Sequence, residues 1–444
     1  MARYLIIVLL LALALAVSVI QLGRGPADDR NGDSDTWNPE ILQPAKQTTR
    51  DSFFGISGNV RDKGFFNQLA VGTYRPGFFL SINEKVALYV DRRYDRILRD
   101  TLSNGTTPMI VVYAKKMEDE QTARRLARQV AEYYTSGEGS KRTGKGVKYW
   151  EIGNEENGGW GSSCIPEDYL MILKPYAEGI RDACPDCRIV MGGLLDDVPG
   201  ERDLEPYLER FLQLGGGRYV DVYNFHYYGT SRPVGVGQCY LDGAKILRSV
   251  RRILESYNES SSAIWVTETC TFSGKVGDVY QSEEEQAADL VKRMALMKVL
   301  GVEKVFWCFI VEPDYEGGTD EGFFDQSGLV YDGKGRYDGG EGVKKKAFFA
   351  YRKIVELLSD SSPVGLQNDT LTYLARFSTS RGGVSVLWQD KWAGDRGVVV
   401  EGEGEIQVLS IYGDRISSGI GSVEIELGVQ PVYVLGKATR FRYR

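Results

Sequence analysis

The chain has 444 residues, of which 42% are apolar and 26% are charged, and it contains a single histidine. This length suits two or three domains, or one α/β barrel of about 250 residues with an added domain. One histidine excludes a zinc site built from several histidines, and it leaves only His226 for a Ser-His-Asp or Cys-His mechanism. A net charge of −7 does not favour a phosphate-binding surface, so we expect no nucleic-acid partner.

The N-terminus carries an apolar run from Tyr4 to Ile20, with Arg3 before it and a polar segment after it. The run is long for the core of a signal peptide and slightly short for a spanning helix of about 20 residues. We expect residues 1–22 to be an export signal, either cleaved or kept as a membrane anchor. Residues 23–50 are polar and rich in Gly, Pro and Asp, which indicates a linker. The sequence therefore predicts an extracellular or cell-surface protein, with a possible membrane tether.

Between residues 51 and 360, short apolar runs alternate with longer amphipathic segments. We expect strands at Phe53–Ser57, Ala70–Phe79, Met109–Ala114, Lys148–Ile152, Ile189–Leu194, Val220–Tyr227, Ala263–Thr267 and Lys304–Ile310. Eight strands that alternate with helices are typical of a (β/α)8 barrel, or TIM barrel. A doubly wound open sheet also alternates, but no Gly-x-Gly-x-x-Gly fingerprint follows the first strand.

Residues 361–444 have a different pattern, because strand-like runs follow one another without helices between them. These runs alternate in polarity and are separated by Gly and Asp. The sequence predicts a C-terminal antiparallel β-sandwich here. A separate feature is the Cys184-Pro-Asp-Cys187 stretch, for which we expect a surface turn, with or without a disulfide that closes it. The alternatives are a redox-active motif and half a zinc site, but no second Cys-x-x-Cys pair exists.

Two carboxylates follow predicted strands at the rim where barrel enzymes carry functional residues. Glu155 ends the segment Trp150-Glu-Ile-Gly-Asn-Glu after the fourth strand, and Glu268 ends Val266-Thr-Glu after the seventh. Strands four and seven of a closed barrel face one another across its mouth. One carboxylic acid can then protonate a leaving glycosidic oxygen while the other carboxylate attacks the anomeric carbon. A strand-end Glu also commonly forms a salt bridge or caps a helix, but a matched pair favours catalysis.

These segments resemble clan A of the glycoside hydrolases, the retaining (β/α)8 enzymes with Asn-Glu on strand four and Glu on strand seven. The resemblance covers roughly residues 50–360, and it is nearest to the β-xylosidase/α-L-iduronidase family and the α-L-arabinofuranosidases. It implies that Glu155 is the general acid/base and that Glu268 is the nucleophile. It also implies that Asn154 binds the sugar 2-hydroxyl. The clan needs no cofactor, and we expect neither a cofactor nor a metal here.

Four further residues match the same clan at strand ends. In His226-Tyr-Tyr228, the resemblance implies that Tyr228 holds the Glu268 carboxylate and that His226 contacts the sugar or Glu155. Arg75 resembles the strand-two arginine that supports the nucleophile, and Trp307 resembles the aromatic floor of the first sugar subsite. The alternatives are a structural histidine, a salt bridge on the barrel rim and a core tryptophan.

The sequence therefore predicts an exported or membrane-tethered retaining glycoside hydrolase. It would cleave O-glycosidic bonds of an extracellular oligo- or polysaccharide by double displacement. The alternative is a non-catalytic carbohydrate-binding surface protein on a degenerate barrel. The presence of both carboxylates argues against this alternative, because binding alone does not need the pair.

Overall fold

The computed structural model describes residues 53–58, 63–77, 79–82, 95–96, 98, 106–113, 116–117, 119–143, 146–159, 164–196, 198, 200–229, 241–313, 322–336, 338–369, 371–390 and 394–444. The expected export segment (1–22) and linker (23–50) lie outside these residues. Within the described part of the chain, no helix is both long enough and apolar enough to cross a membrane.

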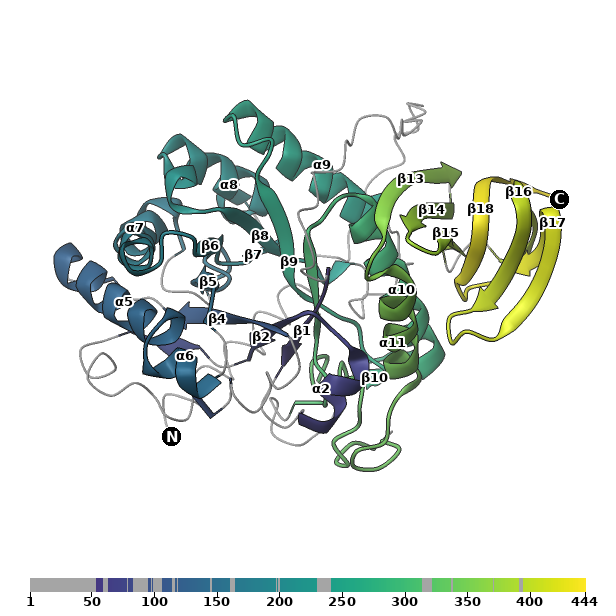
Figure 1. The fold of residues 1–444 in the computed structure, drawn as a ribbon, viewed down its shortest axis with the longest axis horizontal. Helices are drawn as coiled ribbons and strands as arrows, with labels where there is room; N and C mark the ends of the chain where they lie inside the picture. The colour runs from purple at the N-terminus through teal and green to yellow at the C-terminus, as the bar shows by residue number, and fades with distance from the viewer. Residues whose placement is uncertain are drawn as a thin grey trace. The chain divides into compact units, whose positions relative to one another are not determined.

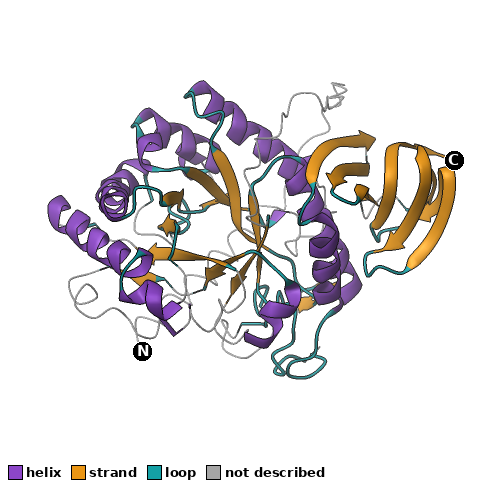
Figure 2. Cartoon of the chain, viewed as in Figure 1, coloured by secondary structure: helices purple, strands orange, loops and turns teal. Residues whose placement is uncertain are grey.

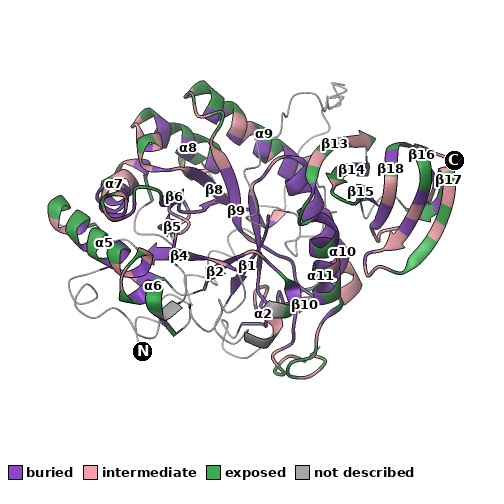
Figure 3. Cartoon of the chain, in the orientation of Figure 1, coloured by how far each residue is buried: buried purple, intermediate pink, exposed green. Residues whose placement is uncertain are grey.

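Eight of the described strands form a closed parallel barrel (Figure 1), which confirms the predicted fold class. In order around the barrel they are β1 (Phe54–Gly58), β2 (Thr73–Pro76), β4 (Thr107–Tyr113), β5 (Tyr149–Ile152), β6 (Arg188–Met191), β8 (Val222–His226), β9 (Ala263–Thr269) and β12 (Lys304–Cys308). The barrel closes because β12 pairs in parallel with β1. The strands are buried on both faces, as expected where helices cover the outside and side chains fill the inside (Figure 3).

Helices lie between the strands in sequence and surround the barrel (Figure 2). They are α2 (Lys63–Leu69), α5 (Glu120–Thr135), α6 (Glu138–Thr143), α7 (Pro166–Ala183), α8 (Leu204–Gln213), α9 (Leu241–Ser256), α10 (Glu283–Val299) and α11 (Lys346–Leu358). Helix α5 buries one stripe of residues at spacings of three and four, typical of a helix with one face in water. Helix α10 is instead buried from Gln286 to Val299, because it packs against α11 and against strands of the C-terminal domain.

The C-terminal residues form the expected antiparallel β-sandwich. Its strands are β13 (Ser362–Asp369), β14 (Thr372–Thr379), β15 (Gly382–Gln389), β16 (Arg396–Ser410), β17 (Arg415–Leu427) and β18 (Val432–Tyr443). They are hydrogen-bonded in the order β13-β14-β15-β18-β16-β17. Leu374 on β14 and Leu427 on β17 come from distant strands of this path and meet in one hydrophobic core. The sheet therefore folds over and packs against itself.

Candidate active site

The segment after β5 presents Glu155 at the end of the barrel where the strands finish. The chain turns at Gly153, whose φ is +89°, and Glu155 itself has a φ of +52°. A left-handed conformation is uncommon for a residue with a side chain and is found more often at functional sites. The backbone N–H of Glu155 donates to the Gly193 carbonyl at 2.9 Å, which holds it in this conformation.

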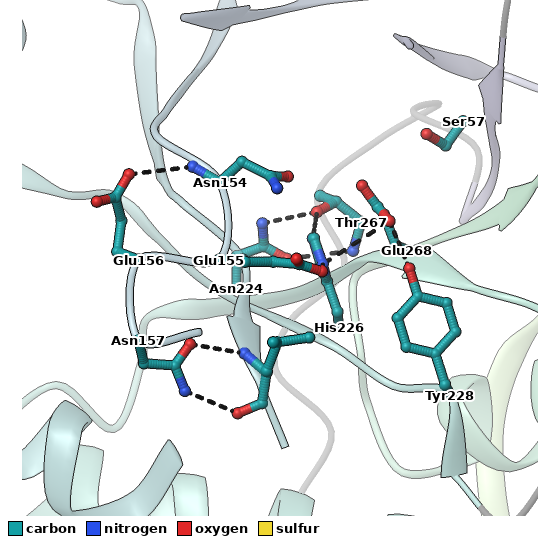
Figure 4. Close-up of polar contacts among 12 residues, drawn as sticks. Ser57, Asn154, Glu155, Glu156, Asn157, Asn224, His226, Tyr228, Thr267 and Glu268 are labelled. Atoms are coloured by element: carbon teal, nitrogen blue, oxygen red, sulfur yellow. Dashed lines mark hydrogen bonds and ion pairs between the residues drawn. The ribbon is translucent and has the colours of Figure 1, made fainter. Parts of the chain in front are cut away.

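The neighbouring carboxylate, Glu156, points to the other side of this segment (Figure 4). Its Oε1 accepts a hydrogen bond from the backbone N–H of Asn154 at 3.3 Å, and the side chain is buried. The side chain of Asn157 bonds the backbone of Leu195 in both directions, so the segment is tied to β7 (Leu194–Leu195). Of the two adjacent glutamates, Glu155 is therefore the one whose side chain lies beside His226 and Glu268.

A β-bulge in β9 brings Glu268 to the same place. Phe225 of β8 pairs with Val266, but the next residue, His226, pairs with Glu268, so one extra residue lies in β9. The pairing with β12 shifts at the same point. Bulges re-aim side chains next to functional sites. Consecutive strand residues normally point to opposite faces of the sheet. Here the bulge lets both Thr267 and Glu268 point into the site, where they contact His226 and Arg75.

Arg75, at the end of β2, holds several of these side chains with one guanidinium. Its Nε and Nη2 donate to the two oxygens of Glu151 at 2.6 and 3.1 Å. Its Nη1 donates to Glu268 Oε1 at 2.6 Å, and Nη2 also donates to Asn154 Oδ1 at 2.8 Å. The planar fork of an arginine can serve three partners in fixed directions, which a lysine ammonium cannot do. Arg75 thus fixes Glu268 and Asn154 relative to one another.

Glu268 receives hydrogen bonds at both oxygens, because Tyr228 donates its hydroxyl to Oε2 (Figure 4). Burial by itself raises the pKa of Glu268. The charges of His226 and Arg75 and the hydrogen bonds from Tyr228 and Arg75 outweigh this effect, so the pKa lies below its usual value. The site therefore favours the ionised carboxylate.

His226, the last residue of β8, lies between the two carboxylates. Its Nδ1 is 2.8 Å from Glu155 Oε1 and 3.8 Å from Glu268 Oε2, and its Nε2 is 3.2 Å from Thr267 Oγ1. Burial by itself lowers the pKa of His226, but the charge of Glu268 and the contact with Glu155 outweigh burial and raise it. A Cβ on Gly193 would lie 2.1 Å from Nε2, so only glycine leaves room for the ring.

The two carboxylates are more exposed than the histidine and the arginine that contact them. The side chains of Glu155 and Glu268 are 14% and 16% exposed, whereas that of His226 is 0% exposed and that of Arg75 is 2% exposed. One oxygen of Glu155 lies within 4.8 Å of one oxygen of Glu268. The arrangement thus offers two closely spaced carboxylates to a ligand, above a buried layer that holds them in place.

The structure adds residues to this layer that the sequence did not single out. Glu151 is fully buried and accepts hydrogen bonds from Arg75, from Asn224 at 3.1 Å and from Thr267 at 3.2 Å. Asn224 also donates to Thr267 Oγ1 at 2.8 Å. Ser57 lies 3.4 Å from Arg75. Glu151 had one signal in the sequence, because it is a charged residue inside an otherwise apolar strand; the others had none.

Trp307 is the one predicted binding residue that the structure does not bring to the carboxylates. Residues alternate along β12, and Phe306 belongs to the core inside the barrel, so Trp307 faces outward. It is fully buried, and its indole N–H donates to the Ser327 carbonyl at 3.3 Å. This placement agrees with the alternative of a core tryptophan, and we correct the expected subsite floor accordingly.

Among the residues that the structure describes, two groups of side chains have ligand atoms close enough to surround an ion. One consists of Glu155, His226 and Glu268, but Arg75 places a fixed positive charge on Glu268, which opposes a cation there. The other consists of Glu312, Asp332 and Asp338, where the buried ammonium of Lys345 already pairs with Glu312. We assign a metal to neither group.

The two cysteines of the Cys184-Pro-Asp-Cys187 turn form a disulfide, as the expected closed turn requires. This bond rules out the alternative of half a zinc site in the structure as it stands, because both thiols are consumed.

Comparison with known proteins identifies the fold. No family model matches the chain, and no curated protein matches its sequence. Among solved structures, a family 39 glycoside hydrolase from Bacteroides cellulosilyticus WH2 is 17% identical with a TM-score of 0.65, covering 87% of this chain and 81% of that one. A glucosidase from Croceicoccus marinus is 15% identical with a TM-score of 0.63, covering 90% and 97%. A family 51 α-L-arabinofuranosidase from Bifidobacterium longum is 13% identical with a TM-score of 0.61, covering 90% and 98%. This chain therefore has the fold of these clan A enzymes.

Proposed function

We propose that the protein is a retaining glycoside hydrolase in which Glu268 is the nucleophile and Glu155 is the general acid/base. The observation that carries the proposal is the pair of partly exposed carboxylates, one of which is held ionised by Arg75 and Tyr228. The glycoside hydrolases among the structural neighbours give it further support, because they share the fold that places such a pair at the barrel mouth.

The reaction would proceed in two displacements. In the first, a Glu268 oxygen forms a bond to the anomeric carbon while the bond to the leaving oxygen breaks, and Glu155 gives its proton to that oxygen. In the second, Glu155 takes a proton from water, the water oxygen bonds to the anomeric carbon, and the Glu268 carboxylate is released. The result is a sugar with the original anomeric configuration, and both carboxyl groups return to their starting states.

The spacing of the carboxylates supports retention over inversion. Retaining enzymes have carboxyl groups about 5–5.5 Å apart, whereas inverting enzymes leave about 6.5–9.5 Å for a water molecule. One oxygen of Glu155 and one oxygen of Glu268 lie within 4.8 Å of one another, an approach that suits the shorter spacing.

Asn154 would bind the sugar hydroxyl next to the reacting carbon. Its Oδ1 accepts from Arg75 Nη2, so its amide nitrogen is directed elsewhere and is left to donate. A contact of this kind at the 2-hydroxyl strengthens in the transition state, where charge develops on the ring. Arg75 would therefore set the position of both the nucleophile and this amide.

The test is hydrolysis of a panel of aryl glycosides and of plant and microbial polysaccharides, followed by NMR of the first product anomer. We expect at least one glycoside to be cleaved with retention, and we expect Glu268→Ala to abolish cleavage. An activated 2-deoxy-2-fluoro analogue of that glycoside should add its sugar mass to the peptide containing Glu268.

A matched control for the nucleophile variant is Glu303→Gln. Glu303 is a half-buried carboxylate that pairs with Arg188 at the opposite end of the barrel strands, so its loss should leave hydrolysis unchanged. Binding of oligosaccharides without any hydrolysis would instead support a carbohydrate-binding protein, and an active Glu268→Ala variant would remove Glu268 from the proposed role.

We also propose that the protein acts outside the cytoplasm, with residues 1–22 as the export signal or anchor. The apolar run from Tyr4 to Ile20 supports this location, as does the disulfide between Cys184 and Cys187, since disulfides are rare in cytosolic proteins. Fractionation of cells that express the full chain tests it: recovery in the cytosolic fraction alone would contradict export.

A further inference from the structure

The buried layer beneath the two carboxylates contains a chain of hydrogen-bonding groups that runs from Glu151 through Thr267 to His226. Thr267 Oγ1 lies 3.2 Å from Glu151 Oε1. It also lies 3.2 Å from Nε2 of His226 (Figure 4). All three residues are buried, with Glu151, Thr267 and His226 each 0% exposed. A buried chain of this kind cannot exchange its partners for water, so each proton in it must have a defined place.

Asn224 fixes some of the donor and acceptor roles in this chain. The backbone N–H of Thr267 donates to Asn224 Oδ1 at 3.1 Å, which sets the orientation of the amide. The Nδ2 group of Asn224 can only donate, and it has two hydrogens for three acceptors. Thr267 Oγ1 is the nearest acceptor at 2.8 Å, before Glu151 Oε1 and the Met191 carbonyl at 3.1 Å each, so the hydroxyl oxygen accepts there. The hydroxyl has a single hydrogen left to place, and it can donate that hydrogen either to Glu151 or to His226.

The hydrogen on Nε2 of His226 decides between these two arrangements. When the ring is an imidazolium, Nε2–H donates to Thr267 Oγ1, and the hydroxyl donates to the Glu151 carboxylate. When the ring is neutral with its proton on Nδ1, the hydroxyl must turn to Nε2, and Glu151 loses one donor. A buried carboxylate favours the arrangement that keeps its donors, so the chain holds a proton on Nε2. Nδ1 faces Glu155 Oε1 at 2.8 Å and Glu268 Oε2 at 3.8 Å, and a second proton there gives the imidazolium.

The other charged groups around His226 also favour the positively charged ring, with the exception of Arg75. Glu155 and Glu268 face Nδ1 at 2.8 and 3.8 Å, and both favour a positive ring. Arg75 opposes it, but its guanidinium is paired with both oxygens of Glu151. Glu151 thus acts on His226 twice, through the Thr267 hydroxyl and by offsetting the charge of Arg75. The pKa of His226, which lies above its usual value, agrees with this balance.

We propose that Thr267 and Glu151 are positioning residues that hold His226 as an imidazolium and thereby give Glu268 a second positive neighbour besides Arg75. The structural part of this inference stands by itself, whereas its consequence for catalysis rests on the proposed function. An imidazolium at Nδ1 favours the ionised form of Glu268, the form that attacks the sugar. Neither Thr267 nor Glu151 reaches the substrate.

The single histidine of the chain makes a direct test possible. Protein labelled with ring-¹⁵N histidine gives the signals of His226 alone, and their pH dependence gives its titration midpoint without any substrate. In the nearly isosteric variant Thr267→Val we expect the midpoint to fall by about one pH unit, a tenfold change in the ratio of charged to neutral ring. Thr267→Ser keeps the hydroxyl and should restore the wild-type midpoint.

The control is Thr271→Val, which removes another fully buried threonine hydroxyl. That hydroxyl is hydrogen-bonded to Gln281 and not to His226, so the midpoint should not move. Glu151→Gln is the second arm, and we expect it to lower the midpoint as well. A wild-type midpoint in both Thr267→Val and Glu151→Gln would overturn the proposal. If only one variant folds, judged by near-UV circular dichroism, its midpoint alone decides.

The outcome is separable from that of the proposed function. If the wild-type protein cleaves no glycoside but its His226 midpoint falls in Thr267→Val and returns in Thr267→Ser, the hydrogen-bond chain stands and the catalytic role fails. If the protein is active, kcat/KM at neutral pH should fall in Thr267→Val, return in Thr267→Ser and stay unchanged in Thr271→Val.

Discussion

Tyr228 gives the sharpest test of how the site keeps its nucleophile ionised. The variant Tyr228→Phe removes one hydroxyl, which donates to Glu268 Oε2, and leaves the other oxygen bonded to Arg75. The ring itself remains, and it packs edge-on against Phe323 and Phe324 with centroids 6.1 and 5.5 Å away. The perturbation is therefore confined to one hydrogen bond to a charged group.

A hydrogen bond to a charged group contributes about 1.5–3 kcal/mol. This bond favours the ionised form of Glu268, so its loss raises the pKa of that carboxyl group. Each 1.36 kcal/mol corresponds to one pH unit, so the pKa should rise by roughly one to two units. Activity requires the carboxylate and is lost as the pH falls through this pKa. The acidic limb of kcat/KM against pH should therefore move upward by the same amount.

The assay is the pH profile of kcat/KM with the aryl glycoside that the wild-type protein cleaves best. At neutral pH we also expect kcat/KM to fall by roughly 10- to 100-fold, because the same bond orients the attacking oxygen. The matched control is Tyr223→Phe, a buried tyrosine on β8, the strand that precedes Tyr228, whose hydroxyl makes no hydrogen bond with the described residues. An acidic limb that does not move in Tyr228→Phe would refute this account of Glu268.

Three other changes have defined outcomes. Gly193→Ala should displace the His226 ring, because its Cβ would lie 2.1 Å from Nε2, and kcat/KM should fall at least tenfold while the circular dichroism spectrum is kept. Burial lowers the pKa of Lys298 to about 8. Between about pH 8 and 10.5 the unfolded chain therefore binds more protons than the folded one, so the free energy of unfolding should rise with pH in this range. Lys298→Met should raise the free energy of unfolding at pH 7 by on the order of 3 kcal/mol and remove that rise in urea titrations; a rise that persists would contradict the assignment. Asn154→Ala should lower kcat/KM for a normal glycoside far more than for its 2-deoxy analogue, and equal losses would remove the 2-hydroxyl contact.

Much of the barrel could be predicted from local patterns. The strand at Tyr149–Ile152 lies within the expected run, and helix α7 begins and ends at the expected residues, Pro166 and Ala183. These elements are set by hydrophobic periodicity and by a proline at the first helical turn, which act over a few residues. The second strand is shorter than expected, at Thr73–Pro76, because an apolar run does not show where its pairing partners stop.

The sequence by itself determined the two carboxylates and their strands, because Glu155 and Glu268 follow apolar runs whose positions in the alternation are counted along the chain. Only the tertiary structure decided which side chains surround them. Glu151 and Thr267 are 116 residues apart, and they meet through parallel pairing and a bulge that local periodicity does not encode. The same pairing turned Trp307 outward, because the facing of a strand residue depends on register, which neighbouring strands set together.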